Sequence, residues 1–364
     1  MGAQTLAPKP KPWIETPLTE SAPLSKAAGC RILLKHDHLQ PSGSFKSRGL
    51  GLYMLRQLAS SPAPSRVAFY CSSGGNAGLA CVHAANALGR PATVVVPTAT
   101  KDFMVAKLRA AGARQVVQIG RQWGEADRYL REEVIPAAEA RGEVPVYVMP
   151  FDHEAIWEGH STVVDEVKVQ LEDMGVERPD VVVCSVGGGG LINGICEGVE
   201  RYGWDGEGTK VLGMETRGAE SFNRCVVEGR HARLEGIESQ ATSLGALSVS
   251  RRSYELLSTR EYVQSAVLSD GEAAMGCWRL AEDENLLVEL ACGVNVALCY
   301  GGRLEQALGR PVKKDDVVVI EVCGGNAVTV DMMCEWKREH GYLDDRISKK
   351  EKATVPSANT NGYH

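Results

Sequence analysis

Residues 181–191 read VVVCSVGGGGL, a short β-branched run followed by four consecutive glycines. The apolar run predicts a strand that is covered on both faces, as in a parallel sheet. Four glycines in a row cost backbone entropy, which is hard to justify unless the backbone wraps closely around another group. The helix that follows would present free N–H groups, so a phosphate is the expected guest. A turn that is merely closely packed is the alternative.

The spacing of these glycines disfavours a dinucleotide site of the Rossmann type. In either register of Gly-x-Gly-x-x-Gly, Ile192 or Asn193 stands where the third glycine is required.

The rest of the chain repeats the pattern of short apolar strands and longer helices. The predicted strands are 67–71, 92–96, 115–119, 146–149, 181–185, 211–215 and 317–322. The predicted helices are 46–58, 76–88, 101–111, 124–141, 155–174, 190–202 and 270–284. This alternation predicts an α/β fold with two open, mostly parallel twisted sheets and helices on both faces.

The length of 364 residues, at about 150 residues per domain, predicts two domains. Residues 49–149 hold four β/α units and are expected to form the small domain. Residues 1–48 and 150–346 are expected to form the large domain. The segment 347–364 is polar and is predicted to be a disordered tail.

The composition excludes several classes of function. A net charge of −6 argues against general nucleic-acid binding. No apolar run reaches the roughly 18 residues of a membrane span, and the N-terminus lacks the apolar core of a secretory signal. The eleven cysteines include no Cys-x-x-Cys pair. We therefore expect reduced thiols, no membrane association and a cytoplasmic location.

One of the predicted helices begins at a lysine, Lys46, directly after residues 41–45, Pro-Ser-Gly-Ser-Phe. The positive end of the helix dipole disfavours a cation there, so Lys46 is easier to explain if it is deprotonated or bonded as an imine. The segment is not a Walker A loop, because Phe45 and Gln40 stand where glycines are required. A solvated lysine on the first turn is the alternative.

Two further loops follow predicted strands. Residues 72–78, Ser-Ser-Gly-Gly-Asn-Ala-Gly, place backbone N–H groups at a helix N-terminus, which suits an anion. A capped β–α turn would explain them equally. Residues 323–326, Cys-Gly-Gly-Asn, end the strand 317–322 at the sheet edge where ligands gather. Cys323 could also be a small buried apolar residue.

Together these stretches resemble the fold type II pyridoxal-phosphate enzymes, the tryptophan synthase β family, over about residues 15–340. Within that family the chain is most similar to the eukaryotic L-serine dehydratases (serine/threonine ammonia-lyases). The motifs that carry this closer resemblance are 40–46 (QPSGSFK), 156–160 (IWEGH), 187–190 (GGGG), 214–216 (MET) and 322–325 (VCGG).

The resemblance implies a role for each part of these motifs. Lys46 would form the Schiff base with pyridoxal 5'-phosphate, and Phe45 would stack on its ring. Cys323 would lie at the ring nitrogen, and Asn76 would reach the ring hydroxyl. The phosphate would be bound by Gly187, Gly188, Gly189 and Gly190. The substrate carboxylate would be held by Ser72, Ser73, Gly74 and Asn76.

The resemblance also implies a monovalent-cation site, with K⁺ as the expected ion. Its members would be Glu215, Ala219 and Ser221, with carbonyl oxygens from Gly187, Leu244 and Ala246.

The implied reaction is the β-elimination of water from L-serine, which yields pyruvate and ammonia. L-Threonine would give 2-oxobutanoate. A neutral thiol at Cys323 makes a weaker electron sink than a carboxylate would, and so favours elimination. The resemblance further implies a small amino-acid substrate and a homodimer.

Three other enzymes on the same scaffold stay open: a threonine dehydratase, a serine racemase with Ser73 as the acid on the opposite ring face, and a β-replacement enzyme. Four departures from the usual pattern leave substrate choice open. Gly74 stands where alanine is usual, which is expected to widen the space near the substrate Cα. Ser243, Leu290 and the pair Asn326-Ala327 also differ.

Overall fold

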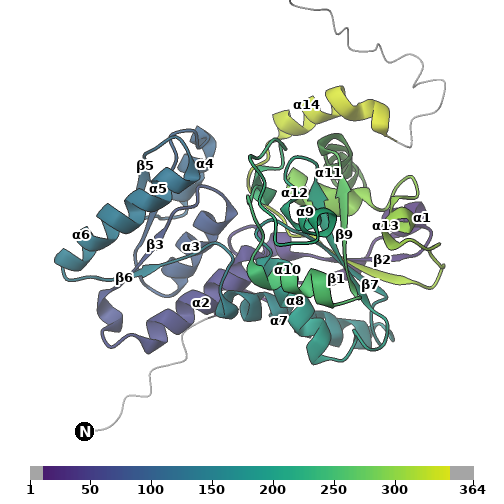
Figure 1. Ribbon diagram of the computed structural model, residues 1–364, viewed down its shortest axis with the longest axis horizontal. Coiled ribbons are helices and arrows are strands. Elements are labelled where there is room, and N and C mark those ends of the chain that lie inside the picture. The colour runs from purple at the N-terminus through teal and green to yellow at the C-terminus, as the bar shows by residue number, and fades with distance from the viewer. Residues whose placement is uncertain (1–10, 345–364) are drawn as a thin grey trace, which may run out of the picture.

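The computed structural model describes residues 11–344, and these contain two separate sheets (Figure 1). The larger sheet has six strands in the order β1-β2-β10-β7-β8-β9. Its strands are β1 (Leu18–Glu20), β2 (Arg31–Lys35), β7 (Val181–Ser185), β8 (Lys210–Thr216), β9 (Val263–Leu268) and β10 (Val317–Glu321). The short β1 pairs antiparallel with β2, and every other neighbouring pair in this sheet is parallel.

The smaller sheet has four strands, all parallel, in the order β5-β4-β3-β6. They are β3 (Val67–Cys71), β4 (Ala92–Val96), β5 (Gln115–Gln118) and β6 (Val144–Tyr147). We call this sheet with its helices the small lobe, and the six-stranded sheet with its helices the large lobe.

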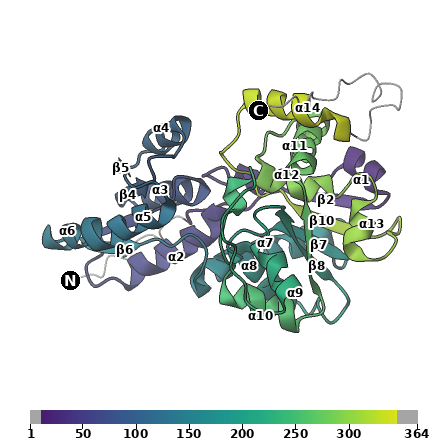
Figure 2. The ribbon, with the colours of Figure 1, turned by 45° about the horizontal axis from the view of Figure 1, so that its top comes forward.

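Helices cover both faces of each sheet (Figure 2). The small lobe contains α3 (Asn76–Ala87), α4 (Asp102–Ala110), α5 (Trp123–Tyr129) and α6 (Ile135–Ala140). The large lobe contains α1 (Ala22–Ala28), α7 (Glu154–Asp173), α8 (Gly190–Arg201), α9 (Ser221–Glu228), α10 (Arg251–Thr259), α11 (Asp270–Glu284), α12 (Leu290–Ala297), α13 (Arg303–Leu308) and α14 (Val330–His340). Helix α2 (Lys46–Ser60) packs against both α3 and α7, so it joins the lobes.

Strand β3 shows why an apolar run without alternation suits the middle of such a sheet. Val67, Phe69 and Cys71 pack into the cluster that contains side chains of α2, α3 and α4. Ala68 and Tyr70 point to the opposite face, where they meet the helical segment that includes α5. Because successive side chains alternate between two buried faces, every position of the strand is apolar.

The predicted fold class is confirmed, and each of the seven predicted strands has a counterpart. Three strands were missed: β1, β2 and β9. The sequence of β2 begins and ends with a charged residue, and β9 carries polar side chains at Gln264 and Ser265. The predicted domain limits stay a prediction, and the limit between residues 48 and 49 falls inside α2. The predicted tail, 347–364, lies outside the described residues.

Within residues 11–344, no helix is long and apolar enough to cross a membrane. All eleven cysteines are free thiols, and ten of them are buried.

Candidate cofactor and substrate site

The loop before Lys46 is attached to the end of β10. Ser44 forms an antiparallel bridge with Gly324, and the N–H of Phe45 donates to the carbonyl oxygen of Cys323 at 3.2 Å. The N–H of Gly325 donates to Gly43 at 2.9 Å. Two motifs that are far apart in the sequence therefore lie side by side at the carboxyl edge of the larger sheet.

Lys46 begins α2, and its amine donates to the carbonyl oxygen of Pro150 at 2.7 Å. Burial lowers the pKa of Lys46 to about 8, although the nearby thiols of Cys71 and Cys323 act in the opposite direction. A lysine with such a pKa has a sizeable uncharged fraction near neutral pH, as a nucleophilic amine requires. This agrees with the expectation that Lys46 is not an ordinary solvated cation.

An aromatic pair packs beside this amine. The Phe45 ring centre lies 5.0 Å from Lys46 Nζ and 5.0 Å from the ring centre of His160. His160 is fully buried on α7, and neither ring nitrogen has a hydrogen-bond partner. Burial, reinforced by the charge of Lys46, lowers the pKa of His160 well below its usual value. His160 is therefore a neutral packing side chain.

The four glycines connect β7 to α8. In the described part of the chain, no hydrogen bond is donated by the backbone N–H of Gly187, Gly188, Gly189 or Gly190. Gly189 has φ of +93°, which an L side chain rarely adopts. A Cβ at Gly188 would overlap with the ring of Phe151. The loop thus offers unpaired donors at a helix N-terminus, and the need for glycine also comes from Phe151, which the sequence did not indicate.

Cys323 ends the strand that supports the Lys46 loop. Its thiol is buried, with the hydroxyl of Ser185 at 3.5 Å. A hydrogen bond with Cys292 and burial raise the pKa of Cys323 well above its usual range. A neutral thiol is therefore present, as the resemblance implies for the ring nitrogen.

The loop 72–76 lies at the carboxyl end of β3. The hydroxyl of Ser72 donates to Asp127 at 2.8 Å, and that of Ser73 accepts from the N–H of Gly75 at 3.3 Å. A Cβ at Gly74 would lie 2.8 Å from Cγ2 of Thr100. The space that Gly74 leaves is thus taken by Thr100 of the same lobe, in contrast to the expected widening near the substrate.

Asn76 links this loop to the large lobe. Its side-chain amide donates to Glu289 at 2.8 Å, and its oxygen accepts from the N–H of Asn326 at 2.9 Å. Burial raises the pKa of Glu289, although hydrogen bonds from Ser243, Ala327 and Asn76 act in the opposite direction. Glu289 was missed as a partner of the site. The available signal was a single carboxylate inside the apolar run 286–291.

Glu215, the carboxylate of the expected cation site, is buried. Glu215 accepts from the N–H groups of Phe222 and Asn223 at 2.8 and 2.7 Å. Burial raises the pKa of Glu215 to about 8. The hydroxyl of Ser221 is buried without a hydrogen-bond partner. A Cβ at Gly187 would lie 3.3 Å from Leu244 Cα, so the fold brings these two expected contributors together.

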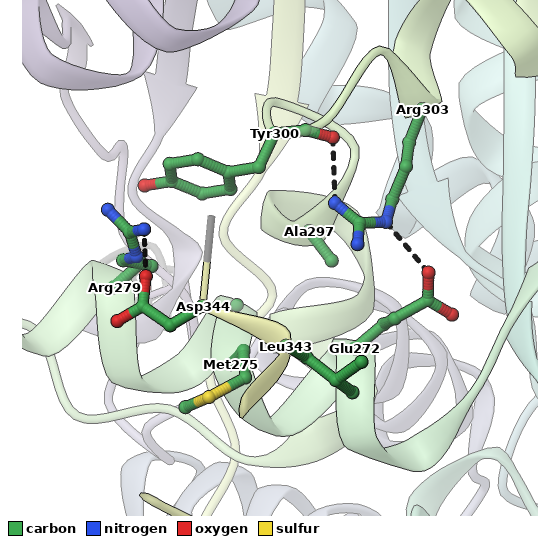
Figure 3. A pocket seen from close by; sticks show the side chains of 9 residues that line it. Glu272, Met275, Arg279, Ala297, Tyr300, Arg303, Leu343 and Asp344 are labelled. Atoms are coloured by element: carbon green, nitrogen blue, oxygen red, sulfur yellow. Dashed lines mark hydrogen bonds and ion pairs between the residues drawn. The ribbon is translucent and has the colours of Figure 1, made fainter. Parts of the chain in front are cut away.

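A separate pocket lies along α11, and its charged side chains pair with one another (Figure 3). Arg303 donates to Glu272 at 2.7 Å and to the carbonyl oxygen of Tyr300. Arg279 pairs with Asp344 and lies over the Tyr300 ring at 4.7 Å. These charges bind one another and attach the chain near residue 344 to α11.

The residues at the Lys46 site fit pyridoxal phosphate. An amine with a lowered pKa suits the aldehyde, the unpaired N–H groups of the glycine loop suit the phosphate, and Phe45 offers an aromatic face. Lys46, the glycine loop and Cys323 would hold the group.

Comparison with known proteins agrees with this fit. The family described as pyridoxal-phosphate dependent enzyme matches residues 11–324. The chain is 41% identical over 324 residues to an L-serine dehydratase of Saccharomyces cerevisiae, covering 87% of this chain and 94% of that protein. It is 40% identical over 309 residues to a catabolic L-serine/threonine dehydratase of the same species, covering 83% and 85%. A solved fungal L-serine ammonia-lyase from Rhizomucor miehei has a TM-score of 0.80 and 33% identity, covering 90% of this chain and 99% of that one. The chain therefore belongs to the family of pyridoxal-phosphate dependent enzymes, which confirms the predicted cofactor.

Proposed function

We propose that this protein catalyses the dehydration and deamination of L-serine to pyruvate and ammonia, and that L-threonine gives 2-oxobutanoate by the same route. The observation that carries the proposal is the meeting of Lys46, with its pKa lowered to about 8, and the neutral thiol of Cys323 at one sheet edge. The likeness to serine and serine/threonine dehydratases supports the choice of substrate.

The bound cofactor supplies an electron-withdrawing ring for the substrate's Cα. The residues of the chain bind, orient and move protons. Lys46 Nζ would hold the cofactor, and once the substrate's amine had replaced it there, the released Lys46 amine would accept the Cα proton as a general base. The 72–76 loop orients the substrate carboxylate through N–H groups and the Asn76 amide. The neutral thiol of Cys323 would bring no negative charge to the cofactor ring, which would favour elimination of water from the substrate.

The test is pyruvate release from L-serine by the purified protein with pyridoxal phosphate and potassium, beside a Lys46→Ala variant. We expect release from the wild type and none from the variant. If the wild type releases no pyruvate while it shows the visible absorbance of the bound cofactor, the serine-dehydratase proposal is wrong. L-Threonine, D-serine analysis and added thiol nucleophiles would then separate the other enzymes on this scaffold.

We also propose that K⁺ binds at Glu215. A buried carboxylate with a pKa raised to about 8 loses stability as the pH rises from its ordinary value of 4.5 through 8, and a cation would remove that cost. We therefore expect potassium to raise the melting temperature of the wild type at pH 8 and to leave the Glu215→Gln variant unchanged. An equal response of both proteins would contradict this site.

A homodimer and a cytoplasmic location complete the proposal. The free state of all eleven cysteines supports a reducing compartment. Light scattering after size-exclusion chromatography tests the dimer.

A further inference from the structure

One residue of the large lobe, Asn326, binds two helices of the small lobe at once. Its N–H and its side-chain amide both donate to Asn76 Oδ1 at the start of α3, at 2.9 and 3.2 Å. Its carbonyl oxygen accepts from Lys107 Nζ of α4 at 2.7 Å. The same side-chain amide donates to the carbonyl oxygen of Ser42 at 2.8 Å, four residues before Lys46.

The hydrogen bond from Lys107 to Asn326 connects the two lobes through a charged donor. Lys107 is half-buried, and burial lowers its pKa while the charge of Glu289 raises it. Hydrogen bonds from charged donors are roughly twice as strong as those between neutral groups. Glu289 in turn accepts from Asn76 at 2.8 Å and from the N–H of Ala327 at 3.1 Å. The charge of the Lys107 ammonium therefore acts on the same buried carboxylate that accepts a hydrogen bond from Asn76.

We propose that Lys107 is a positioning residue that latches the small lobe onto the large lobe through Asn326, and so holds Asn76 and its loop in place for the substrate carboxylate. The role in substrate binding rests on the proposed function, whereas the latch itself does not. Asn326, which departs from the usual sequence pattern, therefore has a structural role. Its carbonyl and amide join α4, α3 and the Lys46 loop at one point.

The latch is expected to affect substrate binding more than chemistry. Without this contact, a smaller fraction of molecules has the small lobe in the position that binds the substrate. The apparent affinity for the substrate falls in proportion to that fraction. Once the substrate has closed the site, Lys46 and Cys323 are unchanged. The expected effect is thus a higher KM with little change in kcat.

The experiment compares holoenzymes carrying Lys107→Met, Lys107→Arg and a matched control, Lys101→Met. Lys101 is exposed and immediately precedes α4. With L-serine, Lys107→Met should raise KM about tenfold, equivalent to about 1.4 kcal/mol, with kcat within twofold of wild type. Lys107→Arg should restore most of the loss, because arginine keeps the charge and the donors. Lys101→Met should behave as wild type.

A second measurement does not depend on activity. Amide hydrogen exchange of the cofactor-bound protein should be faster in α4 and in residues 323–327 for Lys107→Met than for wild type or Lys101→Met. Asn326→Ala, which loses the amide contacts with Asn76 and Ser42, should show the same direction of change. If one of these two variants folds poorly, the other still tests the latch.

Several results would overturn the latch. These are an unchanged KM, a fall in kcat at constant KM, a failure of Lys107→Arg to restore KM, and exchange equal to wild type. A wild type that binds the cofactor but releases no pyruvate would contradict the proposed function instead, and hydrogen exchange alone would then decide the latch.

Discussion

Arg48, two residues after Lys46, is fully buried, and we predict that Arg48→Met strongly destabilises the protein. Its guanidinium binds Asp37, itself fully buried, at 2.6 and 2.7 Å. It also binds Glu166 of α7 at 2.5 and 2.7 Å. Burial alone would raise the pKa of Asp37, but the charge and hydrogen bonds of Arg48 hold it at about 2. The substitution leaves that carboxylate buried without its counter-ion.

Removing one partner of a buried ion pair costs about 3–5 kcal/mol. For a domain of about 150–250 residues, 1 kcal/mol corresponds to about 2–4 °C, so the melting temperature should fall by roughly 6–20 °C. The matched control lies on the same helix. Arg56 pairs with Glu158 at 2.6 Å, but these side chains are 49% and 47% exposed. Such pairs contribute about 0.2–1 kcal/mol, so Arg56→Met should lower the melting temperature by about 4 °C at most.

The assay is thermal unfolding at pH 5.5 and 8 for the wild type, Arg48→Met, the control Arg56→Met, Asp37→Asn and the double variant Asp37→Asn/Arg48→Met. In the wild type, Asp37 contributes stability above pH 3.8 that is lost only as the pH falls toward 2. In Arg48→Met its pKa should lie above 3.8, so the deficit should grow as the pH rises. A loss below about 4 °C at pH 8, or a double variant as unstable as the sum of both single changes, would refute the reasoning.

Two further predictions concern the cofactor site. Gly188→Ala places a Cβ onto the Phe151 ring, and overpacking of about 1–3 kcal/mol should weaken pyridoxal-phosphate binding by about 5- to 150-fold. Fluorescence titration of the apoprotein measures this, with Gly236→Ala as control because no atom lies within 4 Å of its added Cβ; equal affinities would contradict the packing argument. The rate at which the apoprotein forms a borohydride-reducible bond with pyridoxal phosphate should rise with pH around a midpoint of about 8, because only the uncharged amine of Lys46 reacts. A midpoint near the ordinary 10.5 would show that burial does not lower this pKa.

Local patterns predicted the strands of the fold well where both faces of a strand are covered. The run 181–185 needs no partner to be recognised, because its first four positions are apolar and the glycines begin two residues after it ends. Strand β9 is different, since its side chains after Val263 are only half-buried and its sequence alternates weakly. It is a strand because it pairs with β8, which no window of a few residues contains.

The candidate site divides in the same way. The residues of the Lys46, glycine and Cys323 motifs were recognisable from their order in the sequence. Their meeting depends on the hydrogen bond between Phe45 and Cys323, which joins the start of α2 to the end of β10. Glu289, Phe151 and Lys107 carry no motif, and only their position in space connects them with the site.

The alternation of strands and helices, the glycine turns and the lysine at a helix start follow from the sequence alone, because backbone preference and apolar periodicity act over a few neighbouring residues. The lowered pKa of Lys46, the neutral thiol of Cys323 and the contact of Lys107 with Asn326 follow only from the tertiary structure. Each depends on which distant atoms exclude water from a group or offer it a partner, and that is decided when segments far apart in the sequence pack together.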